Sequence, residues 1–499
     1  MSSKQLAFLV IVLCSFSSVL YGQDTPGNQS KPAGPATASA AVKAPKLDRL
    51  STVWTFGNHE PITMYRRIGG PSTGGITGGA LWLEDWHHWF DSEEATILME
   101  KLGLNALHCR FYKGMGWDFE SKDFPAVQGF VRNCHKHGIT VLAYIQFATL
   151  YYEIMLDEVP DLADWAAVDE TGKKYTYGGS PFRWMPCINA PGFEPYLKKM
   201  IKIALTEGNF DGIMFDNIIS YPCYCPRCQE LFRAYLAKEK NPMATLGIPT
   251  TKHVCLPPQE IRSAKCEIQD PIRQRWLQFR CDRLTGLLSR LYDYAYEVKP
   301  DSLITGNVWD IRNRTRSLAF SISPTEMGRC YDFQLVQSNN APKVEGDTII
   351  SRIHEMKLCQ EFDQPVVALC DRDGALWSET SYYLTLLEDA VFGGVPTDRT
   401  IVKPDKEEGF VSTKRIATCA PLLDRFRAMV KQCRESLDAP VSSPVRLLYS
   451  TESHMFSAAS WKALFTTEEV LLRNHVPYGL LISSQSKPFV IPNDCRMLI

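Results

Sequence analysis

The chain of 499 residues lacks any large excess of charge of one sign. Its 54 Lys and Arg residues nearly balance its 56 Asp and Glu residues, so the net charge is −2. Nucleic-acid binders and polybasic membrane surfaces concentrate positive charge, and neither class is expected here. A phosphate-binding loop, a nucleotide fingerprint and a nucleophilic serine elbow are also absent, which argues against nucleotide chemistry and serine-type catalysis.

Long hydrophobic runs are absent too, apart from one near the N-terminus. Lys4 precedes the apolar run 6–14, which is followed by serines and a small residue at Gly22. This pattern describes a secretory signal peptide, and the run is too short for a stable membrane span. We predict that residues 1–22 are removed and that the protein is secreted or periplasmic, with a lipid anchor on Cys14 as the minor alternative. Residues 23–46 are rich in Pro, Ala, Gly, Ser and Thr, and are predicted to form a flexible linker.

From residue 80 onward, short apolar segments alternate with helical patterns. The predicted strands are 80–83, 106–112, 140–146, 211–216, 303–308, 333–337, 365–369 and 395–397. The predicted helices are 92–102, 123–137, 193–207, 226–240, 270–298, 381–391 and 421–437. Such alternation indicates a parallel sheet with right-handed crossovers, and eight units fit a closed barrel better than an open sheet. We therefore predict an α/β fold, with a (β/α)8 TIM barrel over residues 47–440.

A second α/β unit is predicted after the barrel, over residues 441–499. Pro440 and Pro444 mark the boundary, and a strand at 445–450, a helix at 461–473 and a strand at 478–482 follow. A complete α/β layer needs more strands than these. We expect that the unit is either truncated or completed by another subunit, which predicts a homo-oligomer.

The strongest local signal is the string Phe-Asp-Gly-Ile-Met-Phe-Asp-Asn at 210–217. Asp216 leaves the predicted fourth strand at its carboxyl end, which in a barrel is the face that carries the active site. We interpret Asp216 as a catalytic or substrate-binding residue, with a structural hydrogen-bonding role as the alternative. Asp211, at the opposite end of the strand, is interpreted as a cap or turn residue.

Other polar and aromatic side chains are predicted to line a substrate cup at the same face. Hydroxyl groups of a sugar are recognised by donors and acceptors placed beside flat rings. Aromatic residues make up 11% of the chain, which suits a carbohydrate ligand. The candidate substrate-binding residues are Trp82, Glu84, His108, Arg110, Tyr144, Gln146, Asn189, Asn217 and Asn307.

Four cysteines form a candidate metal site. Cys223, Cys225 and Cys228 lie directly after the fourth strand, and Cys187 lies on the insertion before the third predicted helix. Four thiolates are a usual ligand set for structural zinc. Exported chains also oxidise such cysteines, so zinc and disulfides both stay open at this point.

The segment Cys-Tyr-Cys-Pro-Arg-Cys-Gln at 223–229 resembles the zinc-binding segment of family 42 β-galactosidases. That resemblance implies a structural zinc with a fourth upstream cysteine, and a flavodoxin-like trimerisation domain similar to residues 445–499. This chain departs from that family at one point. An Asn-Glu pair near this strand end supplies the acid/base there, whereas Asn217 is followed here by Ile218.

A closer resemblance is to uncharacterised glycosyl-hydrolase-like barrels, of the type called hypothetical glycosyl hydrolase 6, in the superfamily of α-galactosidases and α-L-fucosidases. The similar segments are 187–191, 211–217, 223–228 and 387–394. In those barrels the Asp that ends the fourth strand is the presumed nucleophile. The resemblance thus implies hydrolysis of an oligo- or polysaccharide through Asp216, with no cofactor required for catalysis.

Glycoside hydrolysis needs a second carboxyl group, about 5 Å from the first in retaining enzymes and about 6.5–9.5 Å in inverting ones. Acids that follow predicted strands are Asp310, Glu345, Asp347, Asp371 and Asp373. We favour Glu345 and then Asp373. A non-catalytic carbohydrate-binding barrel and a structural, oligomer-forming protein on the same fold are the alternative functions.

Overall fold

The structure is a computed structural model that describes residues 47–58, 60–63, 80–259, 265–308, 310–328, 330–337, 342–346, 348–369, 378–398, 411, 413–439, 443–484 and 490–499. The predicted signal peptide and linker lie outside these residues. Within the described ranges, no helix combines the length and apolarity that a membrane span requires.

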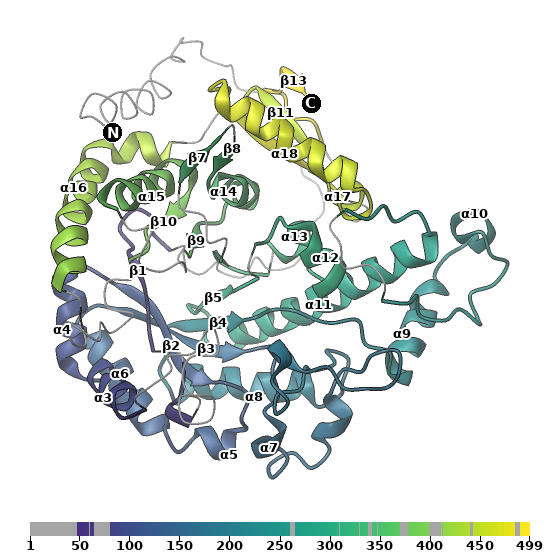
Figure 1. Cartoon of the computed structure of the whole chain (residues 1–499), viewed down its shortest axis with the longest axis horizontal. Helices are drawn as coiled ribbons and strands as arrows, with labels where there is room; N and C mark the ends of the chain where they lie inside the picture. The colour runs from purple at the N-terminus through teal and green to yellow at the C-terminus, as the bar shows by residue number, and fades with distance from the viewer. Residues whose placement is uncertain are drawn as a thin grey trace, which may run out of the picture.

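Among the described residues, eight parallel strands form the centre of the molecule (Figure 1). Five of them pair in sequence order, namely β1 (Trp54–Phe56), β2 (Ala106–Tyr112), β3 (Thr140–Gln146), β4 (Gly212–Asp216) and β5 (Leu303–Gly306). The other three, β6 (Gln334–Val336), β9 (Val366–Ala368) and β10 (Gly394–Val395), form a second parallel sheet in the order β10-β9-β6. Two single parallel bridges, Asn307 to Leu335 and Trp54 to Thr397, join the two sheets into a ring. The predicted TIM barrel is confirmed.

Alternation along the strands determines which side chains face the barrel interior. Tyr144 lies opposite Met214, and Gln146 lies opposite Asp216, one step nearer the carboxyl end. Because successive side chains point to opposite faces, these residues share the inner face, and their neighbours face the helices. The buried cluster inside the barrel consists of Trp54, Phe56, Ala106, Leu142, Tyr144, Met214, Leu303, Phe333, Leu335, Val367, Leu369 and Val395. A filled interior leaves the mouth of the barrel as the place for a ligand.

Helices surround the barrel, and their ends follow the capping signals in the sequence. In α4 (Glu93–Leu102), the Ser92 side chain accepts a bond from the backbone of Ala95, and Gly103 ends the helix with a φ of 68°. In α11 (Pro271–Val298), Asp270 caps the first turn. The other helices packed on the barrel are α6 (Phe124–Lys136), α8 (Phe193–Thr206), α14 (Ile353–Gln360), α15 (Glu379–Phe392) and α16 (Thr413–Asp438). The predicted helices are thus confirmed, although α16 begins earlier than expected and contains Pro421.

The prediction of a strand at 80–83 is wrong. These residues begin the helix α3 (Ala80–Phe90), and the first barrel strand is β1, about 25 residues earlier. Trp86 and Phe90, one helical turn apart, are both buried, with ring centroids 5.4 Å apart. The apolar run therefore has helical spacing once it is read over its full length. Strand β1 has only three residues, too few for a pattern.

Shorter elements fill the loops between strand ends and helices. They are α5 (Trp117–Glu120), α7 (Tyr152–Met155), α9 (Pro226–Leu236), α10 (Pro242–Leu246), α12 (Arg314–Phe320), α13 (Pro324–Met327) and the 3-10 turns η1 (Leu162–Trp165) and η2 (Tyr177–Gly179). After β6, an antiparallel hairpin of β7 (Lys343–Glu345) and β8 (Thr348–Ile350) precedes α14.

The C-terminal residues form a three-stranded parallel sheet. Its order is β12 (Tyr478–Ser483), β11 (Val445–Ser450) and β13 (Met497–Leu498), with α17 (Thr451–Phe456) and α18 (Ala458–Arg473) after β11. This sheet lies beside α12 and α14 at one edge of the barrel (Figure 1). Arg312 bonds Glu468 of α18 at 2.8 Å, and the Lys357 Nζ donates to the carbonyl of Tyr478 at 2.9 Å. The predicted second α/β unit is therefore present, whereas its boundary at residue 440 stays a prediction.

Candidate functional site

Asp216 lies at the carboxyl end of β4 with its carboxylate partly exposed. Three donors orient it. The Tyr144 hydroxyl donates to Oδ2 at 2.5 Å, the Asn307 Nδ2 donates to Oδ1 at 2.8 Å, and the Asn217 Nδ2 also donates to Oδ2. Oδ1 thus has a single bond partner among these three donors. Since a carboxylate oxygen accepts more than one bond, Oδ1 keeps a lone pair for a ligand.

The barrel brings these donors together because they occupy equivalent positions on neighbouring strands. Gln146 on β3 is the direct partner of Asp216 on β4, and Asn307 follows directly after β5. All three lie in the top layer of the interior, at the mouth. Asn217 has a φ of 53°, a left-handed conformation that Asn tolerates better than most residues. This turn directs the chain away from the strand immediately after Asp216.

A buried ion pair supports Tyr144 from the opposite side. The Lys113 Nζ donates to Glu60 Oε1 at 2.8 Å and to the Tyr144 hydroxyl at 2.9 Å. Glu60 is 3% exposed and Lys113 is 4% exposed, so both are buried. Because Lys113 donates to the phenol oxygen, the single Tyr144 proton remains for an acceptor, which is Asp216 or Gln146. Burial and the charge of Asp216 raise the pKa of Tyr144 well above its ordinary value, so Tyr144 keeps that proton.

The sequence analysis did not include Glu60 or Lys113 among the site residues. Glu60 comes four residues after the end of β1, and it was missed because the first strand was placed at 80–83. Lys113 directly follows β2. The rule that polar residues after a strand belong to the mouth would have found Lys113, and would have found Glu60 with β1 in its correct place.

The structure brings some of the predicted substrate-binding residues to Asp216 and places others elsewhere. Tyr144, Gln146, Asn217 and Asn307 surround the carboxylate, as described above. His108 lies deeper in the barrel, stacked on Tyr144 with ring centroids 6.1 Å apart. Their roles in substrate binding stay predictions.

Arg110 and Asn189 have other partners. The guanidinium of Arg110 binds Asp91 through two bonds of 2.7 and 2.6 Å and Asp123 at 2.6 Å, which is a structural ion-pair arrangement. Asn189 lies beside the cysteine cluster, where its Nδ2 approaches the Cys228 sulfur at 3.3 Å. The structure thus provides no support for these two as substrate-binding residues.

The remaining predicted site residues are Trp82, Glu84, Glu345 and Asp373. Glu84 is on helix α3, so the expectation that it follows a strand is wrong. Trp82 is on the same helix, and its side chain lies outside the described part. Glu345 is on the exposed strand β7, where it pairs with Lys343. Asp373 lies outside the described residues.

The four predicted metal ligands converge. Atoms Sγ of Cys187, Cys223, Cys225 and Cys228 all lie within 4.8 Å of one another. Cys187 and Cys228 are 3.6 Å apart, too far for a disulfide, which requires about 2.05 Å. Sulfurs around one tetrahedral zinc, at bonds of about 2.3 Å, are about 3.8 Å apart. Three of the thiols are buried, and the geometry fits a metal better than disulfides.

Comparison with known proteins establishes the fold. No protein-family model matches the chain, and no curated protein matches it either. Among solved structures, the β-galactosidase from Bacillus circulans sp. alkalophilus is similar with a TM-score of 0.62 and 14% identity, over 87% of this chain and 66% of that enzyme. A family 42 exo-carrageenase from Bacteroides ovatus is similar with a TM-score of 0.53 and 13% identity, over 69% of this chain and 52% of that one.

A third similar structure is the catalytic domain of the β-amylase from Paenibacillus polymyxa, with a TM-score of 0.52 and 10% identity, over 75% of this chain and 98% of that domain. Identities this low show the fold alone. The chain spans about two thirds of the length of the Bacillus circulans enzyme. The expected likeness to family 42 β-galactosidases is thus confirmed at the level of fold, and the resemblance to uncharacterised glycosyl-hydrolase-like barrels stays a prediction.

Proposed function

We propose that this protein is a glycoside hydrolase in which Asp216 is the nucleophile. The observation that carries the proposal is the carboxylate of Asp216 itself, at the mouth of the barrel and oriented by three donors. A nucleophile must be held close to its reaction geometry, and donors on three different strand ends and turns provide that restraint. The similar solved structures, which include a β-galactosidase, an exo-carrageenase and a β-amylase, support a carbohydrate substrate.

In the proposed reaction, Asp216 Oδ1 attacks the anomeric carbon and a second carboxyl group protonates the leaving oxygen. Water then releases the sugar from the enzyme. During the attack, Tyr144 and Asn307 keep the Asp216 carboxylate in one orientation while its negative charge is lost to the new bond. We propose Glu345 or Asp373 as the second carboxyl group. Glu60 accepts a hydrogen bond from Lys113, and we assign it the role of positioning Lys113.

We further propose that Cys187, Cys223, Cys225 and Cys228 hold a structural zinc. Zinc would supply no catalytic chemistry there, because four protein ligands leave no open coordination position. Its effect would be on the loop that connects Asp216 to α9. This loop carries Cys223 and Cys225, and Cys228 lies in the first turn of α9, so closing them on a metal restricts the chain directly after the nucleophile.

Export and oligomer formation also remain part of the proposal. The signal-peptide pattern at residues 1–22 supports a secreted or periplasmic location. The edge strand β13 exposes Met497 and Leu498 on a parallel sheet, and Ile499 directly after it is also exposed, which supports a homo-oligomer such as a trimer. Light scattering of the purified protein tests the oligomer.

A screen of aryl glycosides tests the proposed function. We expect the wild type to hydrolyse at least one of them, and Asp216→Asn to lose turnover by at least about 10³-fold. Asp211→Asn, at the other end of β4, is the matched control and should retain turnover per folded molecule. Full turnover in Asp216→Asn would disprove the nucleophile assignment. Sugar binding without hydrolysis of any substrate would favour the non-catalytic barrel.

A further inference from the structure

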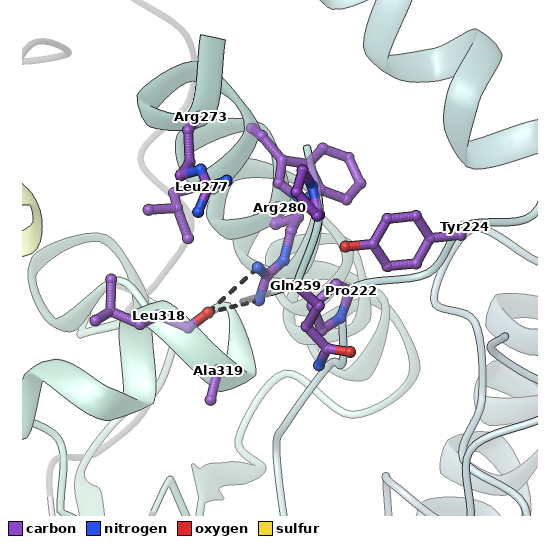
Figure 2. Close-up of a pocket in the computed structure, with 10 residues that line it drawn as sticks. Pro222, Tyr224, Gln259, Arg273, Leu277, Arg280, Leu318 and Ala319 are labelled. Carbon is purple, nitrogen blue, oxygen red and sulfur yellow. Dashed lines mark hydrogen bonds between the residues drawn. The ribbon is translucent and has the colours of Figure 1, made fainter. Parts of the chain in front are cut away.

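A small, open hollow lies between α11, α12 and the loop after β4 (Figure 2). It is separate from the layer around Asp216, yet the same loop leads to it. Pro222 and Tyr224 of that loop form one wall, and Pro222 comes six residues after Asp216. Since each residue spans at most about 3.6 Å, the wall begins within about 22 Å of the nucleophile. This is a distance that an oligosaccharide can span.

Arg280 is the deepest cationic group of the hollow. It is 7% exposed, and its guanidinium donates to the carbonyl of Leu318 and to the hydroxyl of Ser321, which are both neutral groups. These bonds are drawn in part in Figure 2. No carboxylate among the described residues contacts Arg280. Burial lowers the pKa of this guanidinium to about 10, as expected for a cation that lacks a counter-ion.

Three other buried arginines of this protein are held by acids, whereas Arg183 binds neutral hydroxyl groups as Arg280 does. Arg110 binds Asp91 and Asp123, Arg312 binds Glu468, and Arg352 binds Glu388. The negative end of α12, at the carbonyl of Leu318, offsets only part of the charge of Arg280. An anionic ligand in the hollow would supply Arg280 with the negative charge that Asp and Glu side chains supply to Arg110, Arg312 and Arg352.

A second cation lies on the same face of the helix. Arg273 precedes Arg280 by seven residues, or two turns of α11, and also lines the hollow. It makes no ion pair with the described part of the chain. One acid lies at the rim, where Glu170 accepts a bond of 2.5 Å from the backbone of Gln259. Two cations against one acid leave the hollow with positive charge.

Aromatic and amide groups complete the walls. Tyr224 and Trp276 both line the hollow, with ring centroids 6.4 Å apart, and Tyr224 lies across the hollow from Arg280 (Figure 2). The Oε1 of Gln259 accepts from Tyr175 at 2.6 Å, which leaves the Nε2 hydrogens for a ligand. Flat rings beside charged and amide donors are suited to a sugar ring that carries an acidic substituent.

We propose that this hollow is a subsite for the carboxylate or sulfate group of an acidic sugar, some units away from the bond that reacts at Asp216. The inference rests on the proposed glycosidase function and specifies its substrate class as an acidic oligo- or polysaccharide. Arg273 and Arg280 bind the anion and Tyr224 contacts the ring, while the buried Trp276 packs beside Tyr224. A uronate and a sulfated sugar present the same chemistry to the two guanidinium groups, and experiment separates them.

Calorimetric titration with galacturonate, galactose 6-sulfate, galactose and inorganic sulfate tests the subsite. We expect one or both acidic sugars to bind at least about tenfold more tightly than galactose, with the preferred acid identifying the substituent. Arg273→Gln should abolish this preference. Arg290→Gln, on the same helix and paired with Glu194, is the control and should leave it unchanged. Arg273 is half-buried at the hollow, so its variant tests the subsite even where Arg280→Lys fails to fold.

Two outcomes overturn the subsite. One is equal binding of galactose and both acidic sugars, and the other is binding of inorganic sulfate as tight as that of galactose 6-sulfate, which would leave the aromatic walls without a role. The titrations are repeated with Asp216→Asn, because binding does not need turnover. If no glycoside is hydrolysed but the acidic sugars still bind, the proposed function is contradicted and the subsite is not. Hydrolysis of neutral glycosides without acidic-sugar preference contradicts the subsite alone.

Discussion

At the scale of single residues, Asp216 is oriented by neutral donors and not by a direct ion pair. Tyr144 is central to this arrangement, since its hydroxyl accepts from Lys113 and donates to Asp216. The distances of 2.8, 2.9 and 2.5 Å from Glu60 through Lys113 and Tyr144 place the two carboxyl groups at most about 8 Å apart. The Tyr144 hydroxyl therefore links the buried ion pair to the carboxylate of Asp216 by hydrogen bonds.

Removing that phenol should lower the rate. We predict that Tyr144→Phe lowers kcat by about 10- to 100-fold, because a hydrogen bond to a charged group contributes about 1.5–3 kcal/mol. Steady-state kinetics on the best aryl glycoside measures the effect. Tyr235→Phe removes a hydroxyl that bonds Asp282 at 3.1 Å, far from the mouth, and is the control that should keep full activity. Unchanged kcat in Tyr144→Phe would contradict the orienting role.

The ion pair beneath Tyr144 can be tested by its stability. Lys113→Met leaves the carboxylate of Glu60 buried without its cation, and we predict a loss of about 3–5 kcal/mol in the free energy of unfolding. The double variant Lys113→Met with Glu60→Gln should recover part of this loss, because no charge is then buried. Urea unfolding of both single variants and the double variant gives the coupling. Additive effects would show that the two groups do not depend on one another.

At the scale of elements, the loop after β4 joins the three features of functional interest. It begins at Asp216, contributes a wall of the proposed anion-binding hollow through Pro222 and Tyr224, and carries two of the four clustered thiols, with a third in the first turn of α9. Loops on a rigid scaffold commonly carry function, and a metal is one way to make such a loop rigid.

Metal analysis tests that element. We predict about one zinc per chain in the purified protein and close to none in Cys228→Ser, since three remaining thiolates bind zinc much less well than four. Cys255→Ser is the matched control, because Cys255 is exposed and outside the cluster. Cys228→Ser should also melt at a lower temperature than wild type. The zinc assignment would be contradicted if the wild-type protein contained no metal and a thiol titration showed that the four cysteines were in disulfides.

At the scale of the whole molecule, one buried ion pair joins the barrel to the C-terminal sheet. Glu468 of α18 is fully buried and accepts from Arg312 and from His354, each at 2.8 Å. Burial alone would raise the pKa of Glu468, but Arg312 and His354 outweigh it and lower the pKa to about 2. The ionised form is thus favoured in the folded chain.

The sign of this shift predicts the pH dependence of stability. Because the folded pKa lies below the ordinary value of about 4.5, the stabilisation is present above pH 4.5 and is lost as the pH falls from there to about 2. We predict that Glu468→Gln lowers the free energy of unfolding by about 3 kcal/mol at pH 7, and that the difference from wild type shrinks below pH 4.5.

Chemical denaturation of both proteins across this pH range measures the prediction. Asp424→Asn removes an exposed pair with Arg427 and should change stability by less than about 1 kcal/mol at every pH. A constant difference between Glu468→Gln and wild type from pH 7 to pH 3 would contradict the assigned role of the pair.

Much of the architecture could be predicted from local patterns. Strand β3 was predicted with its observed bounds because five apolar or aromatic residues, 141–145, lie between Thr140 and Gln146, shortly after the helix-ending Gly138. The predicted helices 92–102 and 270–298 begin at Ser92 and Asp270, which are the residues that cap α4 and α11. Asp216 was recognised by its place at the end of an apolar strand. The run 80–83 was misread because four residues do not distinguish a strand from the first turn of a helix.

By itself, the sequence determined which segments form strands and helices and which acid ends β4, since these depend on periodicity and capping over a few residues. Only the tertiary structure decided the partners. The single bridges that join β5 to β6 and β10 to β1, the binding of Arg110 to Asp91, and the approach of Lys113 to Tyr144 all involve residues distant in the chain. Such contacts depend on the closure and register of the barrel, because register determines which side chains meet at its mouth and no local pattern encodes it.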